Sequence, residues 1–105
     1  MSQDKLKSYL GFSIKSGEVV FGFDTLLETK KKVKCVIYCN TVNPKIENKL
    51  ISLCEYKNWA LLKTQTQTLS TLVSRDNCKV MGLINKNLIK AIMEQDIKII
   101  IKGEF

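Results

Sequence analysis

The chain has 105 residues, which fits one domain (residues 1–105), and its 45% apolar and 26% charged residues are typical of a globular protein with a core. It contains no histidine, which excludes hydrolases that pair histidine with serine or cysteine and zinc sites that need imidazole. Seventeen basic residues against ten acidic ones give a net charge of +7, which favours a polyanionic partner such as RNA, DNA or an anionic membrane face.

The first residues carry no pattern typical of a signal peptide. Asp4, Lys5 and Lys7 interrupt the apolar residues of the segment 1–14. The strongest apolar run near the end of the chain, residues 97–101, is short and contains Lys98, so no segment is long enough to span a membrane. We therefore expect a cytoplasmic protein with no membrane partner.

Apolar residues return every three or four positions in five segments, which predicts amphipathic helices. These segments are residues 6–14, 23–27, 46–54, 69–73 and 88–93. Asn43 before Pro44 is typical of a helix N-cap followed by proline at the first helical position, and Asn85 is placed to cap the last helix.

Two uninterrupted apolar runs, residues 35–39 and 80–84, predict central strands covered on both faces. Shorter runs at 19–21 and 59–62 predict further strands, and 97–101 fits either a terminal strand or a helical extension. Alternation of helices and strands predicts an α/β fold, a three-layer α/β/α sandwich with five helices and a mixed or parallel sheet of about four strands.

The four cysteines lack the spacing of a metal or redox site. Cys35, Cys39, Cys54 and Cys78 form no Cys-x-x-Cys pair, and two of them belong to an apolar run. We expect packed, free thiols and no metal site. Carboxylates such as Glu18 have no nucleophile or metal set beside them, so the sequence predicts no active site, no cofactor and no small-molecule substrate.

The best candidate site is the turn at residues 22–25, where a short strand passes through Gly22 into a helix start at Phe23, Asp24 and Thr25. A helix start presents unpaired N–H groups, and glycine allows a phosphate or a base edge to approach closely. The alternative is purely structural: Gly22 makes a tight turn and Asp24 caps the helix or complements its dipole.

A dense basic cluster follows this helix, formed by Lys30, Lys31, Lys32 and Lys34. It resembles a polyanion patch, but cations at the C-terminal end of the same short helix also complement the helix dipole without any ligand. If the helix continues to Lys31, that residue lies more than about 10 Å from Gly22, a span suited to an extended RNA.

Several segments spread over about residues 6–93 carry a family resemblance: 10–12, 15–17, 20–25, 34–38, 54–56, 69–72 and 80–84, with Asn43 and Lys49. Together they resemble the ribosomal kink-turn-RNA-binding superfamily, specifically its small bacterial YlxQ-like branch. The resemblance implies a sandwich that docks the N-terminus of its second helix on a bent RNA, while an apolar loop near the last central strand covers an extruded base.

Residue by residue, the resemblance is partial. The family's turn glycine matches Gly22, whereas its asparagine, glutamate and lysine positions are Asp24, Thr25 and Glu28 here. An anion at the lysine position should repel RNA by about 1 kcal/mol where it is partly exposed. The loop that would cover the base matches residues 73–79, whose Arg75 and Lys79 could meet phosphates.

Two functions follow as hypotheses. The first is a non-enzymatic, ribosome-associated protein that binds structured RNA through the turn at 22–25 and contacts the backbone with basic side chains. These are Lys15, Lys30, Lys31, Arg75 and Lys79. The second is a protein–protein interaction or assembly module on the same scaffold that has lost specific RNA binding.

Overall fold

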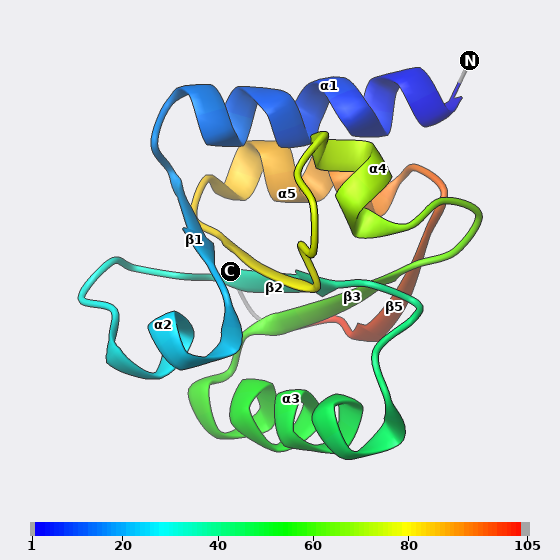
Figure 1. The fold of residues 1–105 in the computed structure, drawn as a ribbon. Coiled ribbons are helices and arrows are strands. Elements are labelled where there is room, and N and C mark those ends of the chain that lie inside the picture. Colours follow the sequence, from blue (N-terminus) through cyan, green and yellow to red (C-terminus); the bar gives the residue numbers. More distant parts are fainter. Residues whose placement is uncertain (1, 104–105) are drawn as a thin grey trace.

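Five helices and five strands alternate along the chain in the computed structural model, which describes residues 2–103, with side chains from residue 5 (Figure 1). The helices are α1 (Ser2–Lys15), α2 (Phe23–Glu28), α3 (Pro44–Lys57), α4 (Leu69–Val73) and α5 (Lys86–Met93). The strands are β1 (Val19–Phe21), β2 (Cys35–Tyr38), β3 (Ala60–Thr64), β4 (Val80–Leu83) and β5 (Ile97–Ile101).

The strands form one mixed sheet in the order β1-β4-β2-β3-β5. Strands β2 and β3 are parallel, and the other three pairs are antiparallel. The α/β class, the five helices and the mixed sheet are confirmed. The predicted count of about four strands is corrected to five, because the terminal segment pairs with β3 as an edge strand and does not extend α5.

Helices lie on both faces of the sheet. In Figure 1, α1, α4 and α5 lie above it, while α2 and α3 lie below. Alternate side chains of β2 enter the two resulting cores: Cys35 and Ile37 pack in the upper one, and Val36 and Tyr38 in the lower one. All four are fully buried, as their uninterrupted apolar run predicts.

The predicted helix caps are present. The Asn43 side chain accepts a hydrogen bond from the Ile46 amide at 2.9 Å, and Pro44 occupies the first turn of α3. The Asn85 side chain accepts from the amides of Asn87 and Leu88 and begins α5. Both caps set where a helix begins after a buried strand, so they fix the loops at the ends of β2 and β4.

A polar group holds α3 against the sheet. The Tyr38 hydroxyl and the Lys63 ammonium both donate to Glu47 Oε2, at 2.6 and 3.0 Å. These two donors hold the pKa of the Glu47 carboxyl below its usual value, the tyrosine hydrogen bond contributing most. Burial, reinforced by Glu47, raises the pKa of the Tyr38 hydroxyl, so it stays a donor at neutral pH.

All four cysteines are free and buried, as predicted. Burial raises the pKa of the Cys54 thiol to about 12. Among residues 2–103, no helix has the length and apolar character needed to cross a membrane.

Candidate nucleic-acid interface

Three connections meet at one end of the sheet and enclose a cavity of about 550 Å³. Strands β1 and β2 end there and the antiparallel β4 begins there, because Phe21 pairs with Met81 and Tyr38 with Val80. The cavity is lined by residues 21–23, residues 41–43 with Ile46, and residues 75–80. Segments far apart in sequence therefore form one concave surface.

Gly22 forms the first wall of this cavity. Its backbone has φ 90° and ψ 149°, a region that only glycine adopts readily. Its amide donates to the Val80 carbonyl at 3.0 Å, and its own carbonyl accepts from the Leu26 amide at 3.2 Å. The turn therefore needs glycine for its shape, which agrees with the structural interpretation, and both polar backbone groups of Gly22 are already hydrogen-bonded within the protein.

The connection between α4 and β4 forms the second wall, and hydrogen bonds from α4 hold it in place. Ser74 and Asn77 have left-handed backbone conformations with φ of 55° and 57°. The Ser70 hydroxyl donates to the Cys78 carbonyl at 3.2 Å and accepts from the Cys78 amide at 2.9 Å. This loop is therefore ordered by its own hydrogen bonds, without a ligand.

Two cations of this loop are fixed against the cavity. The Arg75 guanidinium lies over the Phe21 ring, 4.0 Å from its centroid. The Lys79 ammonium donates to the Thr41 hydroxyl at 2.8 Å. It thus links the second wall to the loop after β2, which forms the third wall. Both side chains remain exposed, so each retains N–H groups that can bind an anion.

The charge at this end of the sheet is nearly balanced. Asp76 lines the cavity beside Arg75, and Asp24 is an exposed carboxylate in the first turn of α2. Apolar and aromatic side chains such as Phe23, Val42 and Ile46 make up much of the remaining lining. The surface therefore offers a mainly apolar hollow with two cations on its rim.

The predicted site residues divide into groups. Gly22, Phe23, Arg75 and Lys79 line the cavity together. Asp24, Thr25 and Glu28 are exposed along α2, outside the lining. Lys15, Lys30 and Lys31 are exposed as well but lie outside this lining, and Lys31 reaches toward the start of β1.

The predicted extension of α2 into the lysine cluster is wrong. The helix ends at Glu28, and Thr29 is extended with φ −67° and ψ 143°. The Thr29 hydroxyl accepts from the Lys31 amide at 3.1 Å, a local hydrogen bond that competes with continuation of the helix. The Lys31 ammonium donates to the carbonyls of Gly17 and Val19, at 3.0 and 3.2 Å. Lys31 therefore anchors a loop and does not belong to a helix end.

Sequence reasoning missed the third wall. Thr41, Val42 and Ile46 line the cavity, and Asn43 was predicted as a cap only. A signal was available, because the loop after a buried central strand lies at the end of the sheet where ligand sites of α/β proteins are common.

Comparison with known proteins finds no protein-family model and no curated protein that matches this chain. Among residues 2–103, no group of three or more Cys, Asp or Glu side chains is arranged to hold a metal ion. A proposal for the function therefore rests on the shape and charge of the cavity.

Proposed function

We propose that this chain is a non-enzymatic RNA-binding protein, cytoplasmic and ribosome-associated, that docks the turn at Gly22 and the start of α2 on structured, kink-turn-like RNA. The single observation that carries the proposal is the convergence of Gly22, Arg75 and Lys79 on one cavity from separate connections. Bases held out of a helix bind apolar and aromatic surfaces, while cations at the rim bind phosphates.

We also propose membership of the kink-turn-binding superfamily. Helices on both faces of the sheet support the three-layer α/β/α sandwich that this family has. The substitutions at Asp24, Thr25 and Glu28 remove family contacts along α2. RNA binding would therefore depend more on the α4–β4 loop, whose Arg75 lies over Phe21 and whose Lys79 donates to Thr41.

The test is fluorescence anisotropy with a labelled kink-turn RNA, a plain RNA duplex and a single strand, each over a salt series. We expect preference for the kink-turn. The variants Arg75→Ala and Lys79→Ala should each make the slope of log affinity against log salt less negative by about 0.7–0.9, as the loss of one phosphate contact requires. Gly22→Glu should remove the preference, because it places a charged side chain at the cavity wall and strains the turn, and Gly22→Ala, which strains the turn without adding charge, separates the two effects.

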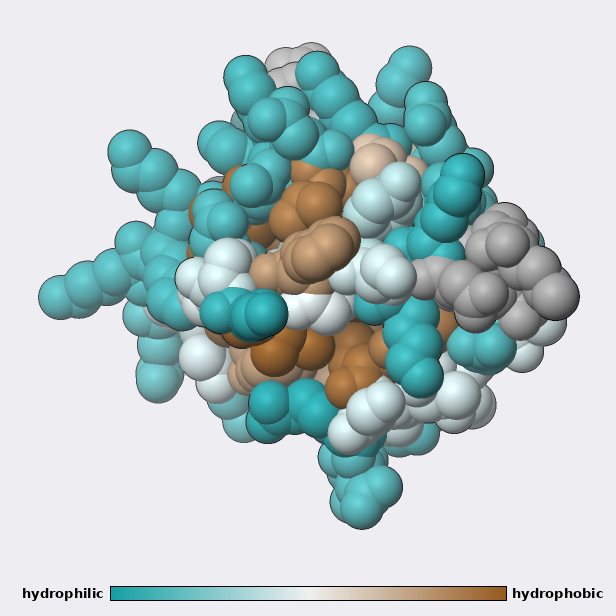
Figure 2. All heavy atoms as spheres, turned by 90° about the horizontal axis from the view of Figure 1, so that it is seen from above, coloured by the Kyte–Doolittle hydropathy of each residue, from teal (hydrophilic) through white to brown (hydrophobic). Residues whose placement is uncertain are grey.

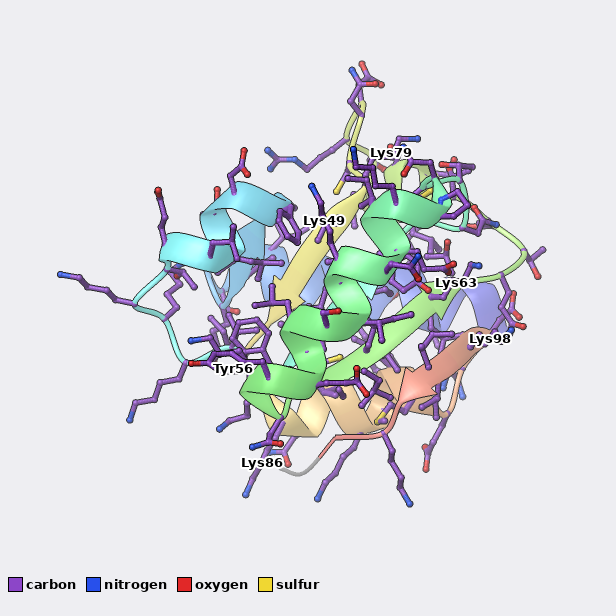
Figure 3. All side chains as sticks on the ribbon, turned by 90° about the horizontal axis from the view of Figure 1, so that it is seen from below. Lys49, Tyr56, Lys63, Lys79, Lys86 and Lys98 are labelled. Carbon is purple, nitrogen blue, oxygen red and sulfur yellow. The ribbon has the colours of Figure 1, made fainter. Side chains whose placement is uncertain are left out.

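Lys98→Ala is the matched control, because Lys98 is exposed on β5 and lies away from Lys79 (Figure 3). It removes the same charge and should leave kink-turn preference unchanged. Equal affinity for the three RNAs, or equal losses in Lys79→Ala and Lys98→Ala, would contradict docking at the cavity.

The alternative function is the protein-interaction module, and exposed apolar side chains favour it. Phe12 on α1 is 57% exposed and Tyr56 on α3 is 81% exposed. On the face seen from above, however, hydrophilic side chains break up the hydrophobic areas (Figure 2). Dimerisation in light scattering, together with no RNA binding at low salt, would favour this alternative.

A further inference from the structure

A second basic surface lies at the other end of the sheet. Strands β1, β2 and β3 begin there and β4 and β5 end there, as the pairs Val19 with Leu83, Cys35 with Ala60 and Leu61 with Ile101 require. Each of these connections carries lysine within four positions of the strand end. We call this surface the lysine edge and define it as Lys15, Lys32, Lys34, Lys57, Lys86 and Lys102.

Hydrogen bonds tie these connections together. The Lys34 amide donates to the Leu83 carbonyl at 2.9 Å, and the Lys34 carbonyl accepts from the Ala60 amide at 3.0 Å. The Asn85 side chain, next to Lys86, donates to Glu18 at 3.5 Å. The lysines before β2 and after β4 therefore lie on one surface, and Figure 3 shows Lys86 at the end of the molecule opposite Lys79.

Lys31 keeps the longest of these loops in place. Its ammonium group donates to the Gly17 and Val19 carbonyls, which fixes the loop between α2 and β2 on the start of β1. Val33 in the same loop is buried. Lys32 lies between these two anchors with its own side chain exposed, so little backbone order has to be gained when it binds a ligand.

The charge at the lysine edge is not balanced. In the part of the chain that the structure describes, the single salt bridge joins Lys63 to Glu47, so no lysine of the edge is paired with a carboxylate. Glu18 is the nearest carboxylate in sequence to Lys15, and it accepts from Ser16 and Asn85. The edge carries six lysines with the carboxylates of Glu18 and Glu55. The cavity end carries Arg75 and Lys79 with the carboxylates of Asp76 and Asp24, so the edge has the larger excess of positive charge.

The chemistry of the edge favours a phosphate backbone. Lysine is a point charge and lacks the planar fork with which arginine recognises bases and carboxylates, so such a surface does not read sequence. The lysines come from separate connections and do not form one face of an amphipathic helix, which is what binding to a membrane surface usually requires.

We propose that the lysine edge binds the phosphate backbone of an RNA duplex regardless of sequence, so that the protein holds two RNA segments at opposite ends of its sheet. The choice of RNA as the polyanion rests on the proposed function. The edge itself is independent of the cavity, since none of its residues lines it.

The test compares two triple variants with the same loss of charge. The edge variant is Lys15→Gln, Lys32→Gln and Lys86→Gln, and the control variant is Lys7→Gln, Lys90→Gln and Lys98→Gln; all six lysines are exposed. With a plain RNA duplex, the edge variant should bind at least about tenfold more weakly at low salt. Its slope of log affinity against log salt should be less negative by about 2–3. The control should change both much less. Circular dichroism verifies that both variants are folded.

Equal losses in the two triple variants would overturn the proposal, because the binding would then follow net charge alone. The proposal would also be overturned if the edge variant bound phosphatidylserine vesicles more weakly than the wild type but bound the RNA duplex equally well. Wild-type protein that carries one equivalent of unlabelled kink-turn RNA should still bind the labelled duplex, and loss of that binding would contradict a second RNA surface. If Gly22→Glu leaves kink-turn preference intact while the edge variant loses duplex binding, the cavity proposal fails and the lysine edge stands.

Discussion

At the scale of single residues, Gly22 has a backbone conformation that other residues adopt only under strain. A methyl group added there would meet only the Thr25 hydroxyl, at 3.9 Å, so space is not the obstacle. We therefore expect Gly22→Ala to lower the free energy of unfolding by about 1–3 kcal/mol through backbone strain alone. Urea unfolding followed by circular dichroism measures it.

Gly11 supplies the opposite case in the same chain. It is exposed within α1, and nothing lies within 4 Å of an added methyl group. Gly11→Ala should raise the free energy of unfolding by about 0.5–1 kcal/mol, since alanine favours the helix. If Gly22→Ala also raises the free energy of unfolding, the strain assigned to Gly22 is absent.

Glu47 makes stability depend on acid. Its pKa is lower in the folded chain than in the unfolded one, so its contribution is present above the unfolded value of about 4.3 and is lost as pH falls through the folded value. Glu47→Gln should lower the free energy of unfolding by about 1–2 kcal/mol at neutral pH. The loss should be small once the Glu47 carboxyl of the wild type is protonated in both the folded and the unfolded chain. Urea unfolding between neutral pH and about pH 3 measures this, with the exposed Glu55→Gln as control. A constant difference across that range would contradict it.

At the scale of elements, the sequence predicted those elements whose pattern is set locally. The buried strands β2 and β4 follow from uninterrupted apolar runs, and α3 follows from its cap and its periodicity. The end of α2 was predicted wrongly, because Lys31 is held by carbonyls more than ten residues earlier. For β5 only the pairing with β3 distinguishes strand from helix.

The loop between α2 and β2 gives a direct test of that anchoring. Lys31→Met keeps most of the side chain but removes the donors to Gly17 and Val19. We expect a loss of about 0.5–1.5 kcal/mol in stability and faster amide exchange across residues 29–34. Lys32→Met, the neighbouring exposed lysine, is the control and should change neither. Indistinguishable exchange in the two variants would contradict the anchor.

At the scale of the whole molecule, the sequence predicted part of the site but not its arrangement. Gly22, Arg75 and Lys79 were all named, yet only the antiparallel pairing of β4 brings them to one cavity. The same pairing separates them from Lys15 and Lys31, which the sequence had assigned to the same RNA surface. A charge count gives no position, because topology decides which lysines share an end of the sheet.

Repulsion between closely spaced lysines should lower the stability of the folded chain, and the salt dependence of the melting temperature measures this. A net charge of +7 with a single salt bridge among the described residues means that unscreened repulsion opposes folding. Raising potassium chloride from about 20 to about 200 mM should therefore raise the melting temperature by a few degrees. This corresponds to a gain of about 0.5–1 kcal/mol in the free energy of unfolding. RNA affinity must fall over the same range, so weaker binding in salt cannot be attributed to unfolding.

The triple variants locate this repulsion. Lys15→Gln with Lys32→Gln and Lys86→Gln should melt at a higher temperature than the wild type at low salt and depend less on salt, because the crowded charges are gone. The control triple at Lys7, Lys90 and Lys98 should gain less, since those lysines lie on α1, α5 and β5. Equal gains would mean that the repulsion is spread over the whole surface. A larger gain at the lysine edge would mean that the edge carries charge at a cost to stability, which is the usual trade-off at a binding surface.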